Sequence, residues 1–330
     1  MRIAVLFGGD SEERDVSIAS AAQVVPALRA SGHEVFLVDT ARGAIAAADE
    51  PHVLEAGVRV APPSSAELDA LPAADASLRL PAEVADAELV FLALHGGAGE
   101  NGQLQSLFEL AGIPYTGSGP VGSAPAMDKE IAKRLFRAAG IRTPDWRVSP
   151  AADAEIDALG LPLIVKPNAQ GSTVGLSLVR ERAGIAAATA AAARFGTALY
   201  EQYIPGRELT VGVLDGAALA VGEILLGGAA TFSYAQKYQA GAVREVFPAD
   251  LPEDVAADAR ALALAAHTCL KLDGYSRSDF RLDDEGRLWL IEVNTLPGLT
   301  ATSLLPQSAA AAGIDYASLC ERICALARRP

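Results

Sequence analysis

The sequence predicts an α/β protein of two or three domains. Residues 3–7 are apolar throughout, residues 17–30 show the apolar periodicity of a helix, and residues 34–38 form a second apolar run, which together make a βαβ opening. The second half instead contains β-prone runs joined by short turns, which favours antiparallel strands and an α+β organisation. A length of 330 residues exceeds that of one ordinary domain.

The amino-acid composition limits the classes of molecule that the protein is expected to bind. The formal net charge of −14 argues against nucleic acid or an anionic membrane, because phosphate groups need a basic surface. No apolar run is long enough to predict a membrane span, and the run that ends at Phe7 is too short for a signal peptide. We therefore expect a cytoplasmic protein. Cys320 and Cys324 lie four residues apart in a helical stretch and are predicted to be buried core residues.

A Gly8-Gly9 turn follows the first strand. The dinucleotide-binding GxGxxG pattern is absent, so this turn alone is weak evidence for a phosphate site. The sequence leaves two interpretations of Glu13 open, as a helix-start partner of Asp10 or as a carboxylate in a cleft at the carboxyl ends of the strands. Residues 41–85 lack apolar periodicity, and we expect irregular surface structure there.

The apolar strand predicted at 89–94 runs directly into His95 and a glycine-rich loop, HGGAGENG. Glycines permit close backbone approach, and loops that leave parallel strands are where α/β proteins place their sites. We therefore expect His95 to line a cleft. A helix at 103–111 and a turn-rich segment at 115–119 follow, and the latter is expected to end the first domain.

Two lysines in the middle of the chain are candidates for binding an anion. Asp128 is a predicted N-cap of a helix at 129–139, which places Lys129 in the first turn, where the helix dipole disfavours a cation. A bound anion would explain this position, although a solvated lysine is the simpler interpretation of the helix alone. Lys166 ends an apolar strand and precedes the loop 167–175, whose Gly and Ser residues suit phosphate binding through backbone N–H groups.

Strands predicted at 199–204 and 209–214 suggest a crossover between domains, against which a nucleotide base would fit. The stretch 227–248 has few helix or strand signals and contains Lys237 and Tyr238. A loop of this length inside a compact domain is usually functional or disordered.

The last predicted unit is a β-hairpin within residues 274–294. We expect Glu285-Gly286 to form a two-residue loop, because the segment reads Asp-Glu-Gly between two β-prone runs. This register pairs Phe280 with Ile291, and Leu282 with Trp289, on one apolar surface.

The opposite surface of the hairpin is charged. The same register places Asp279 opposite Glu292 and Arg277 opposite Asn294, with facing Cβ atoms about 4.5 to 5.5 Å apart. Two carboxylates at this separation repel unless a cation intervenes, and with the amide oxygen of Asn294 they form the oxygen ligand set that Mg²⁺ takes. A solvated charged face is the alternative that the hairpin alone leaves open.

Taken together, these segments resemble the D-alanine:D-alanine ligases of the ATP-grasp superfamily, over nearly the whole chain. The matching segments are GGDSEERDVS from Gly8, HGGAGENG from His95, YTGSG, MDK up to Lys129, KPNAQGSTVG from Lys166, EQYIPGRE from Glu201, KY at Lys237, and RSDF and IEVNTLPGLTATSLLP from Arg277. Each segment alone is weak evidence, whereas their order and spacing are specific.

The resemblance implies an N-terminal parallel-sheet domain (1–119) that precedes a two-lobed ATP-grasp fold, with a central lobe (120–204) and a C-terminal lobe (205–330). It implies an ADP-forming ligase that phosphorylates the carboxylate of one D-alanine with ATP and joins the acyl phosphate to the amine of a second D-alanine, for peptidoglycan precursor synthesis. The expected cofactors are ATP and two Mg²⁺ ions, for which Mn²⁺ can substitute. The expected assembly is a homodimer.

The resemblance also implies a role for each matching residue. ATP would be bound by Lys129, Lys166, Ser172, Glu201, Gln202, Ile204, Glu208 and Lys237. The D-alanines would be bound by Glu13, His95, Arg277, Gly298, Ser303 and the Leu304 backbone. The catalytic group would comprise Glu13, Ser172 and Tyr238, which close a loop over the site, and Arg277 with the Gly298 N–H, which stabilise the tetrahedral oxyanion. The metal ligands would be Asp279, Glu292 and Asn294.

Two positions depart from the family pattern. Gln170 stands where many members have glutamate, and Gln202 where many have lysine, which puts the fine contacts in question rather than the reaction. Tyr238 agrees with the dipeptide-forming members. The alternatives are a related ligase that takes D-serine, D-lactate or an L-amino acid as second substrate, and a nucleotide-binding regulator without catalysis, which the presence of the charged site residues disfavours.

Overall fold

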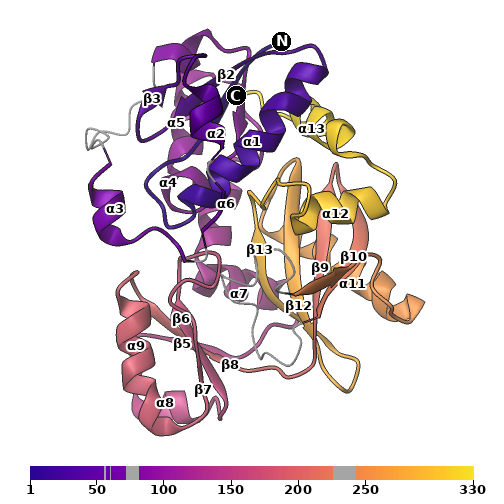
Figure 1. Cartoon of the computed structure of the whole chain (residues 1–330). Coiled ribbons are helices and arrows are strands. Elements are labelled where there is room, and N and C mark those ends of the chain that lie inside the picture. The colour runs from indigo at the N-terminus through magenta and orange to yellow at the C-terminus, as the bar shows by residue number, and fades with distance from the viewer. Residues whose placement is uncertain (56, 60, 72–81, 226–242) are drawn as a thin grey trace.

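The computed structural model describes residues 1–55, 57–59, 61–71, 82–225 and 243–330. The strands in these ranges form three sheets, which Figure 1 shows as an N-terminal body at the top, a central body at the lower left and a C-terminal body at the right. Their strand orders are β3-β2-β1-β4, β5-β8-β6-β7 and β11-β10-β9-β12-β13. The first sheet is parallel apart from its short edge strand β3, and the other two are antiparallel, as the sequence predicts.

The observed elements keep the predicted order. The strands are β1 (Arg2–Phe7), β2 (Glu34–Asp39), β3 (Gly43–Ala44), β4 (Leu89–Leu92), β5 (Trp146–Val148), β6 (Leu163–Pro167), β7 (Ser177–Val179), β8 (Ala198–Gln202), β9 (Arg207–Leu214), β10 (Ala217–Leu225), β11 (Arg244–Val246), β12 (Tyr275–Leu282) and β13 (Leu288–Asn294). The helices are α1 (Arg14–Ala30), α2 (Glu50–Leu54), α3 (Ser65–Asp69), α4 (Gly97–Glu100), α5 (Gln103–Ala111), α6 (Pro120–Met127), α7 (Lys129–Ala138), α8 (Asp153–Asp157), α9 (Ile185–Ala193), α11 (Glu253–Cys269), α12 (Leu304–Ala311) and α13 (Tyr316–Ala325), with 3₁₀ turns η1 (Ala82–Asp86) and η2 (Arg182–Gly184).

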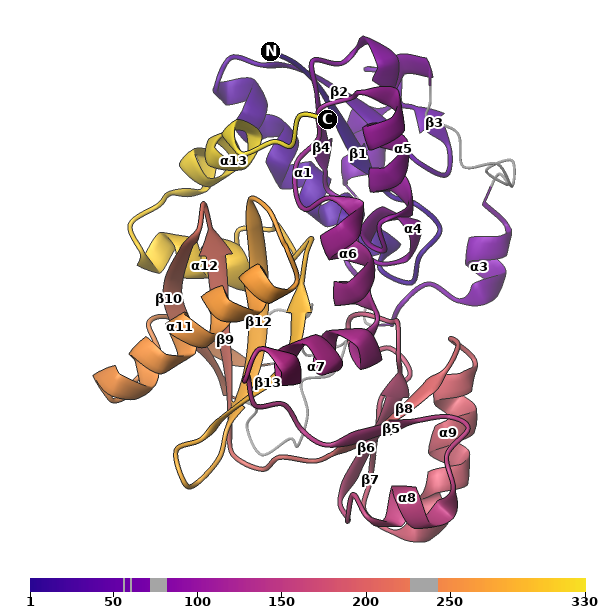
Figure 2. The ribbon, with the colours of Figure 1, turned by 180° about the vertical axis from the view of Figure 1, so that it is seen from behind.

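The N-terminal sheet is buried on both faces, which is why β1 and β4 are apolar throughout. Helix α1 covers one face, and α13 from the far end of the chain packs against α1 (Figure 2). Cys320 and Cys324 of α13 are buried in this core, which confirms the sequence prediction. The prediction of irregular structure at 41–85 was wrong for β3, α2, α3 and η1, because elements of two to five residues are too short to show periodicity. Residues 72–81 lie outside the described ranges.

Strand alternation in the central body directs side chains to two environments. Leu163 and Val165 of β6 join the core under α9, whereas the intervening Ile164 and then Lys166 face a cleft. The same alternation that builds the core therefore directs Lys166, the next-to-last residue of this strand, into the cleft.

In the C-terminal body, α11 and α7 cover the face of the sheet seen in Figure 2, and α12 packs against β9 and β10. Phe136 of α7 is fully buried in this core although the helix precedes the central body in sequence. Helix α7 thus lies between the central and C-terminal bodies, and its first residue, Lys129, reaches the cleft.

The β12–β13 hairpin differs from the predicted register. Asp279 is paired with Glu292 and Arg277 with Asn294, as expected. However, a bulge follows, so that Phe280 pairs with Leu290 rather than with the predicted Ile291. The bulge places one extra residue in β13.

The loop of this hairpin is also one residue longer than predicted. Leu282 pairs with Leu288 rather than with Trp289, and the Asp283 N–H donates to Arg287 O (3.1 Å). Residues 284–286 therefore form a three-residue loop, in which Gly286 takes the left-handed conformation at φ 76°. The longer loop and the bulge compensate, which is why the charged pairs survive while the apolar pairs shift.

Candidate active site

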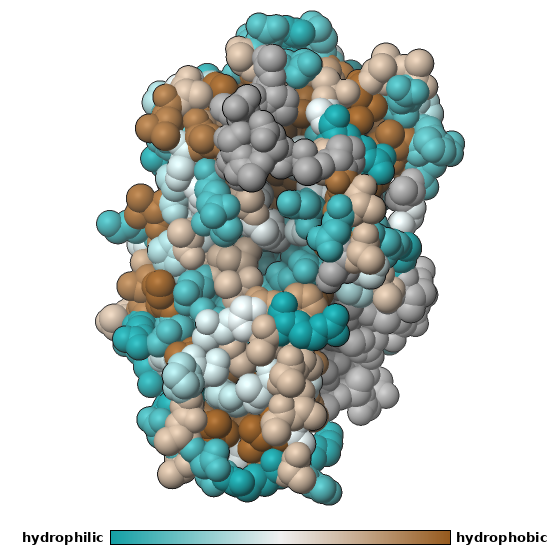
Figure 3. Space-filling view, turned by 90° about the vertical axis from the view of Figure 1, so that its left-hand side faces the viewer, coloured by the Kyte–Doolittle hydropathy of each residue, from teal (hydrophilic) through white to brown (hydrophobic). Residues whose placement is uncertain are grey.

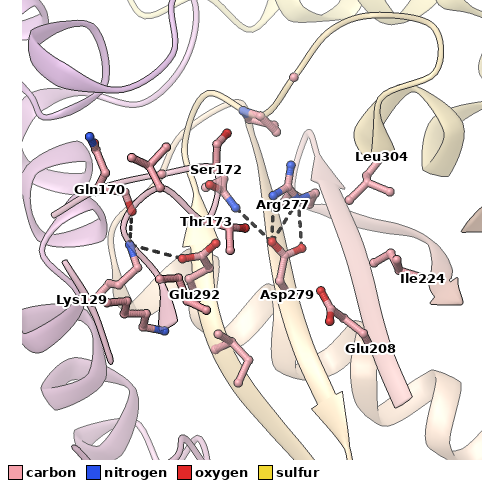
Figure 4. Close-up of a pocket in the computed structure, with 18 of the residues that line it drawn as sticks. Lys129, Gln170, Ser172, Thr173, Glu208, Ile224, Arg277, Asp279, Glu292 and Leu304 are labelled. Atoms are coloured by element: carbon pink, nitrogen blue, oxygen red, sulfur yellow. Dashed lines mark hydrogen bonds and ion pairs between the residues drawn. The ribbon is translucent and has the colours of Figure 1, made fainter. Parts of the chain in front are cut away.

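A cleft of about 1470 Å³, counting the space open to solvent, lies where the three bodies meet. Every described residue assigned above to the site lines this cleft: Glu13, His95, Lys129, Lys166, Ser172, Glu201, Gln202, Ile204, Glu208, Arg277, Asp279, Glu292, Asn294, Gly298, Ser303 and Leu304. In Figure 4, Lys129 and Gln170 form one wall, and Arg277 and Asp279 on the C-terminal sheet form the other. Lys237 and Tyr238 fall outside the described residues.

Glu13 points into the cleft. Its side chain makes no cap hydrogen bond to α1, and its carboxylate accepts a hydrogen bond from the Ser172 hydroxyl of the central body. Ser172 is held at φ 48°, and a Cβ on the preceding Gly171 would clash with the Glu13 carboxylate. The loop therefore approaches Glu13 closely only because residue 171 is glycine. Of the two interpretations of Glu13, the structure supports the cleft.

The loop after β6 is tied to its surroundings by further contacts. Asn168 caps the first turn of α7, because its carbonyl accepts from Lys129 N (3.1 Å) and its side-chain oxygen from Glu130 N (2.9 Å). Gln170 Nε2 donates to Glu12 Oε2 (2.7 Å), a bond between the central and N-terminal bodies. Residue 170, which departs from the family pattern, thus has a defined partner.

Each carboxylate of the hairpin pairs with a side-chain cation. Lys129 Nζ lies 3.3 Å from Glu292 Oε2, and Arg277 pairs with Asp279 at 2.8 Å. The Asp279 and Glu292 side chains are only 16% and 22% exposed, which rules out a solvated charged face. Asn294 Nδ2 donates to Asp279 Oδ2 (3.2 Å), so the three donors gather as predicted.

This donor set fits Mg²⁺, which prefers carboxylate and amide oxygens and takes its remaining ligands from phosphates and water. Over the described ranges, no group of three or more His, Cys, Asp or Glu side chains has a metal-binding arrangement. A site with two carboxylates and one amide agrees with that finding, because it depends on a substrate to complete the coordination shell.

A loop at 295–299 is clamped from both sides. His95 Nδ1 lies 2.8 Å from Leu296 O, and its Nε2 lies 3.0 Å from Ser20 Oγ. The Glu100 carboxylate accepts from Leu296 N (3.1 Å), and the Tyr316 hydroxyl donates to Leu299 O (2.5 Å). These bonds fix the backbone on both sides of Gly298.

His95 acts on this loop as a neutral ring. Burial lowers the pKa of His95, which leaves the imidazole uncharged at neutral pH. Nδ1–H then donates to the Leu296 carbonyl, and Nε2 accepts from the Ser20 hydroxyl. Both ring nitrogens are thereby engaged by the protein, although the side chain lines the cleft.

The N-terminus of α12 opens into the same cleft. Ser303 is its N-cap residue and Leu304 its first helical residue. A Cβ on Gly298 would lie 2.8 Å from Ser303 Oγ, so the loop and the helix start are in close contact. Backbone N–H groups at a helix N-terminus favour an anionic group.

A buried ion-pair cluster forms the far end of the cleft. Glu201 Oε2 lies 2.7 Å from Lys166 Nζ, and Glu201 Oε1 lies 2.5 Å from Lys133 Nζ. Burial opposes ionisation of Glu201, but the two ammonium groups outweigh it and hold the pKa of the carboxyl below its ordinary value. Glu201 is therefore a carboxylate at neutral pH.

Comparison with known proteins identifies the chain's relatives. The family model described as "D-ala D-ala ligase N-terminus" matches residues 2–118, and the model "D-ala D-ala ligase C-terminus" matches residues 135–325. The chain belongs to the D-alanine–D-alanine ligase family. Its relatives include a D-alanine–D-alanine ligase of Acidiphilium cryptum (46% identity, 97% of this chain, 96% of that one) and one of Gloeobacter violaceus (42% identity, 98% of both).

Solved structures of the D-alanine–D-alanine ligase family share the fold. The crystal structure of the Bacillus anthracis D-alanine–D-alanine ligase complexed with ATP superposes with a TM-score of 0.77 at 31% identity, over 99% of this chain and 97% of that one. The expected ATP-grasp architecture is thus confirmed.

Several residues of this ligase site were missing from the sequence prediction. Arg281 lines the cleft, is buried, and donates to Ile204 O (3.1 Å), Gly206 O (2.7 Å) and Glu208 Oε2 (3.1 Å), which fixes the crossover between the two lobes. Its position could have been found, because it alternates with Arg277 and Asp279 along β12.

The clamp residues Ser20, Glu100 and Tyr316 and the buried Lys133 gave no such signal. Ser20 bonds to Leu299, Glu100 to Leu296 and Lys133 to Glu201, each of which lies at least 68 positions further along the chain. Tyr316 bonds to Leu299, which lies 17 positions earlier. Helical periodicity shows that Lys133 falls on the apolar face of its helix, where a lysine is unusual. It does not identify the carboxylate that pairs with this lysine.

Proposed function

We propose that this chain joins two D-alanine molecules into D-alanyl-D-alanine with ATP, through an acyl phosphate, and releases ADP and phosphate. One observation carries this proposal: a single cleft holds Lys129 and Lys166 on one side and the Asp279–Glu292 pair on the other. That arrangement suits a triphosphate flanked by cations and by metal-binding carboxylates. The product would serve peptidoglycan precursor synthesis.

In the first step, the chain's own residues position the reactants. The Glu13 carboxylate would bind the ammonium of the first D-alanine, and its bond to Ser172 would hold the loop after β6 over the cleft, with Tyr238 completing the group. ATP would be bound by Lys129, Lys166, Lys237, Ser172, Glu201, Gln202, Ile204 and Glu208. Holding the carboxylate and the γ-phosphate in line lowers the entropic part of the barrier.

Asp279, Glu292 and Asn294 would hold two Mg²⁺ or Mn²⁺ ions, which supply charge neutralisation of phosphate oxygens when bound. In the structure, Lys129 and Arg277 balance these carboxylates. We infer that the side chains of Lys129 and Arg277 turn toward substrate oxygens once metal and nucleotide are present.

In the second step, the amine of the second D-alanine attacks the acyl phosphate. Arg277 and the Gly298 N–H would stabilise the resulting oxyanion, and the clamp on residues 295–299 supplies the rigid placement that such donors require. Ser303 and the Leu304 N–H at the start of α12 would bind the second carboxylate. His95 would lie beside the substrates and would act by holding the loop at 295–299 through its bond to Leu296 O.

The proposal extends to assembly, location and domain division. We propose a homodimer, supported by Leu110 on α5 and Val121 on the adjoining α6, two apolar residues that are 87% and 67% exposed. On the face shown in Figure 3, the apolar side chains of the described residues are scattered instead. Sedimentation velocity of wild type and Leu110→Glu tests this, with a monomeric variant expected; a wild-type monomer would contradict it.

A cytoplasmic location is supported by three free cysteines, which suit a reducing compartment, and by the use of ATP. Across the described ranges, no helix is both long and apolar enough for a bilayer span. We propose functional domains at 1–119, 120–204 and 205–330, although α7 and α13 each pack into a core outside the range that contains them.

The function is tested by ADP release from the purified chain. We expect release to require both D-alanine and Mg²⁺ and to stop when EDTA is added. ADP release at the same rate without D-alanine would contradict the proposed ligation. Nucleotide binding without ADP release under any of these conditions would support the alternative of a nucleotide-binding regulator without catalysis.

A further inference from the structure

Lys133 is a lysine with no access to solvent. It lies one turn after Lys129 on α7, its side chain is 0% exposed, and it does not line the cleft. Its ammonium group forms an ion pair with Glu201 Oε1 at 2.5 Å and donates hydrogen bonds to Thr143 Oγ1 at 2.7 Å and Pro144 O at 3.3 Å. A lysine has three N–H donors, so this set fixes the orientation of the group.

The partner of Lys133 is the part that reaches the ligand. Glu201 lines the cleft at the end where the loop between β8 and β9 would receive the adenosine, and only 3% of the residue is exposed. An isolated carboxylate at this depth would take up a proton. Glu201 Oε2 accepts a hydrogen bond from Lys166, whereas Oε1 forms an ion pair with Lys133 and accepts no hydrogen bond from the described residues, so both oxygens retain acceptor positions for a ligand.

The two lysines beside Glu201 differ in what else they can do. Lys166 lines the cleft and is proposed to bind phosphate, which draws its charge away from Glu201 when nucleotide is present. Lys133 has no route to the phosphates, because it is enclosed by Thr143, Pro144 and the Trp146 ring, whose centroid lies 5.5 Å away. Lys133 is therefore the constant partner of the carboxylate.

We propose that Lys133 is a positioning residue that holds Glu201 as an ionised acceptor and thereby makes the nucleotide site select 6-amino purines over 6-keto purines. This inference rests on the proposed use of ATP. An ionised carboxylate only accepts hydrogen bonds, so it pairs with an exocyclic amino group and repels a carbonyl oxygen. A protonated carboxyl or an amide donates as well and would accept either base.

The physical basis is the balance between burial and charge. Burial lowers the pKa of Lys133 to about 8, against the opposing effect of Glu201. Lys133 thus remains charged at neutral pH. Its removal leaves Glu201 with Lys166 as its only ammonium partner among the described residues, and burial then favours the protonated carboxyl.

Equilibrium binding of nucleotide tests the inference without reference to turnover. Isothermal titration calorimetry at pH 7.0 would give Kd values for ADP, GDP and IDP with wild type, Lys133→Met and Glu201→Gln. Lys133→Met keeps the length of the stem against Trp146 and removes the charge. The matched control is Arg134→Met, the next residue of α7, whose side chain is 70% exposed and pairs with Glu130.

We expect wild type and Arg134→Met to bind ADP at least about tenfold more tightly than GDP or IDP, since an unmatched buried polar group is strongly disfavoured. Lys133→Met and Glu201→Gln should each lower that ratio about tenfold. A folded Lys133→Met variant with an unchanged ratio would overturn the inference, as would a wild type that binds IDP as tightly as ADP.

The controls separate the possible failures. If Lys133→Met does not fold, an unchanged ratio in Glu201→Gln still overturns the inference, and a lowered ratio supports it. If wild type binds no ADP at all, the proposed function fails before the role of Lys133 is reached. The two results are therefore distinguishable.

Discussion

Lys129 Nζ lies 3.3 Å from Glu292 Oε2, across the cleft between α7 and β13. The cation in the first turn of α7 thus faces a carboxylate that the hairpin register presents. This pair explains the unusual position of Lys129 without a bound anion, and it shows how the cleft balances charges that we assign to metal and phosphate binding.

Replacing Glu292 by Gln should remove a metal ligand without disturbing the core. We expect ADP release to fall by at least about 100-fold, the scale seen when one electrostatic contact to a transition state is lost. Glu285→Gln is the control, because Glu285 lies in the hairpin loop with its side chain 66% exposed. Full activity of Glu292→Gln in a coupled ADP assay would contradict the metal site.

The Gln170–Glu12 bond should control closure of the loop after β6. Gln170→Glu would place two carboxylates 2.7 Å apart, at a cost of about 1 to 2 kcal/mol, and so raise the KM for ATP about 5- to 30-fold. The double variant Glu12→Gln with Gln170→Glu restores a donor and an acceptor. If steady-state kinetics give the double variant a KM for ATP as high as that of Gln170→Glu, the contact between residues 12 and 170 does not control closure of the loop.

Stability should fall on mild acidification. Burial lowers the pKa of His95 and His267 from the ordinary value of 6.5, so below that pH the unfolded chain binds more protons than the fold. Above about pH 6.5 the two histidines do not change the free energy of unfolding. Below that pH, each lowers the free energy of unfolding by at most about 1.4 kcal/mol for each pH unit.

Urea unfolding at pH 7.5, 6.5 and 5.5 measures this dependence. The variant His267→Gln should lose its share of this pH dependence of the free energy of unfolding. A free energy of unfolding that stays constant down to pH 5.5 would disagree with the buried neutral histidines.

The bulge in β13 can be tested by stability. Leu290 is fully buried in the C-terminal core, whereas Ile291 lines the cleft. Leu290→Ala should therefore cost about 2 to 5 kcal/mol in urea unfolding, and Ile291→Ala half that or less. The predicted register without a bulge would give the reverse order.

This hairpin shows what the sequence could and could not predict. The alternation of charged residues on β12 is a local property, and it led to the Asp279–Glu292 pair. A three-residue loop and a distant bulge compensate each other, and nothing local distinguishes that combination from a two-residue loop in a regular ladder.

Elements held by tertiary packing were missed for a related reason. Helix α6 has the sequence PVGSAPAM, whose Pro and Gly disfavour helix, yet it packs against α7 and β13. Strand β10 is rich in alanine and was likewise not expected, although it pairs with β9 and β11. In contrast, the described residues that the family motifs assign to the site all line one cleft, and their roles there stay predictions.

The central claim is best tested by mass spectrometry of the products formed from a mixture. The wild-type protein would be incubated with ATP, Mg²⁺ and equal amounts of four substrates: deuterated D-alanine and unlabelled D-serine, D-lactate and L-alanine. We predict doubly labelled D-alanyl-D-alanine as the main product, with one ADP formed per dipeptide. A main product that contains only one labelled alanine, or ADP without any dipeptide, would contradict the account.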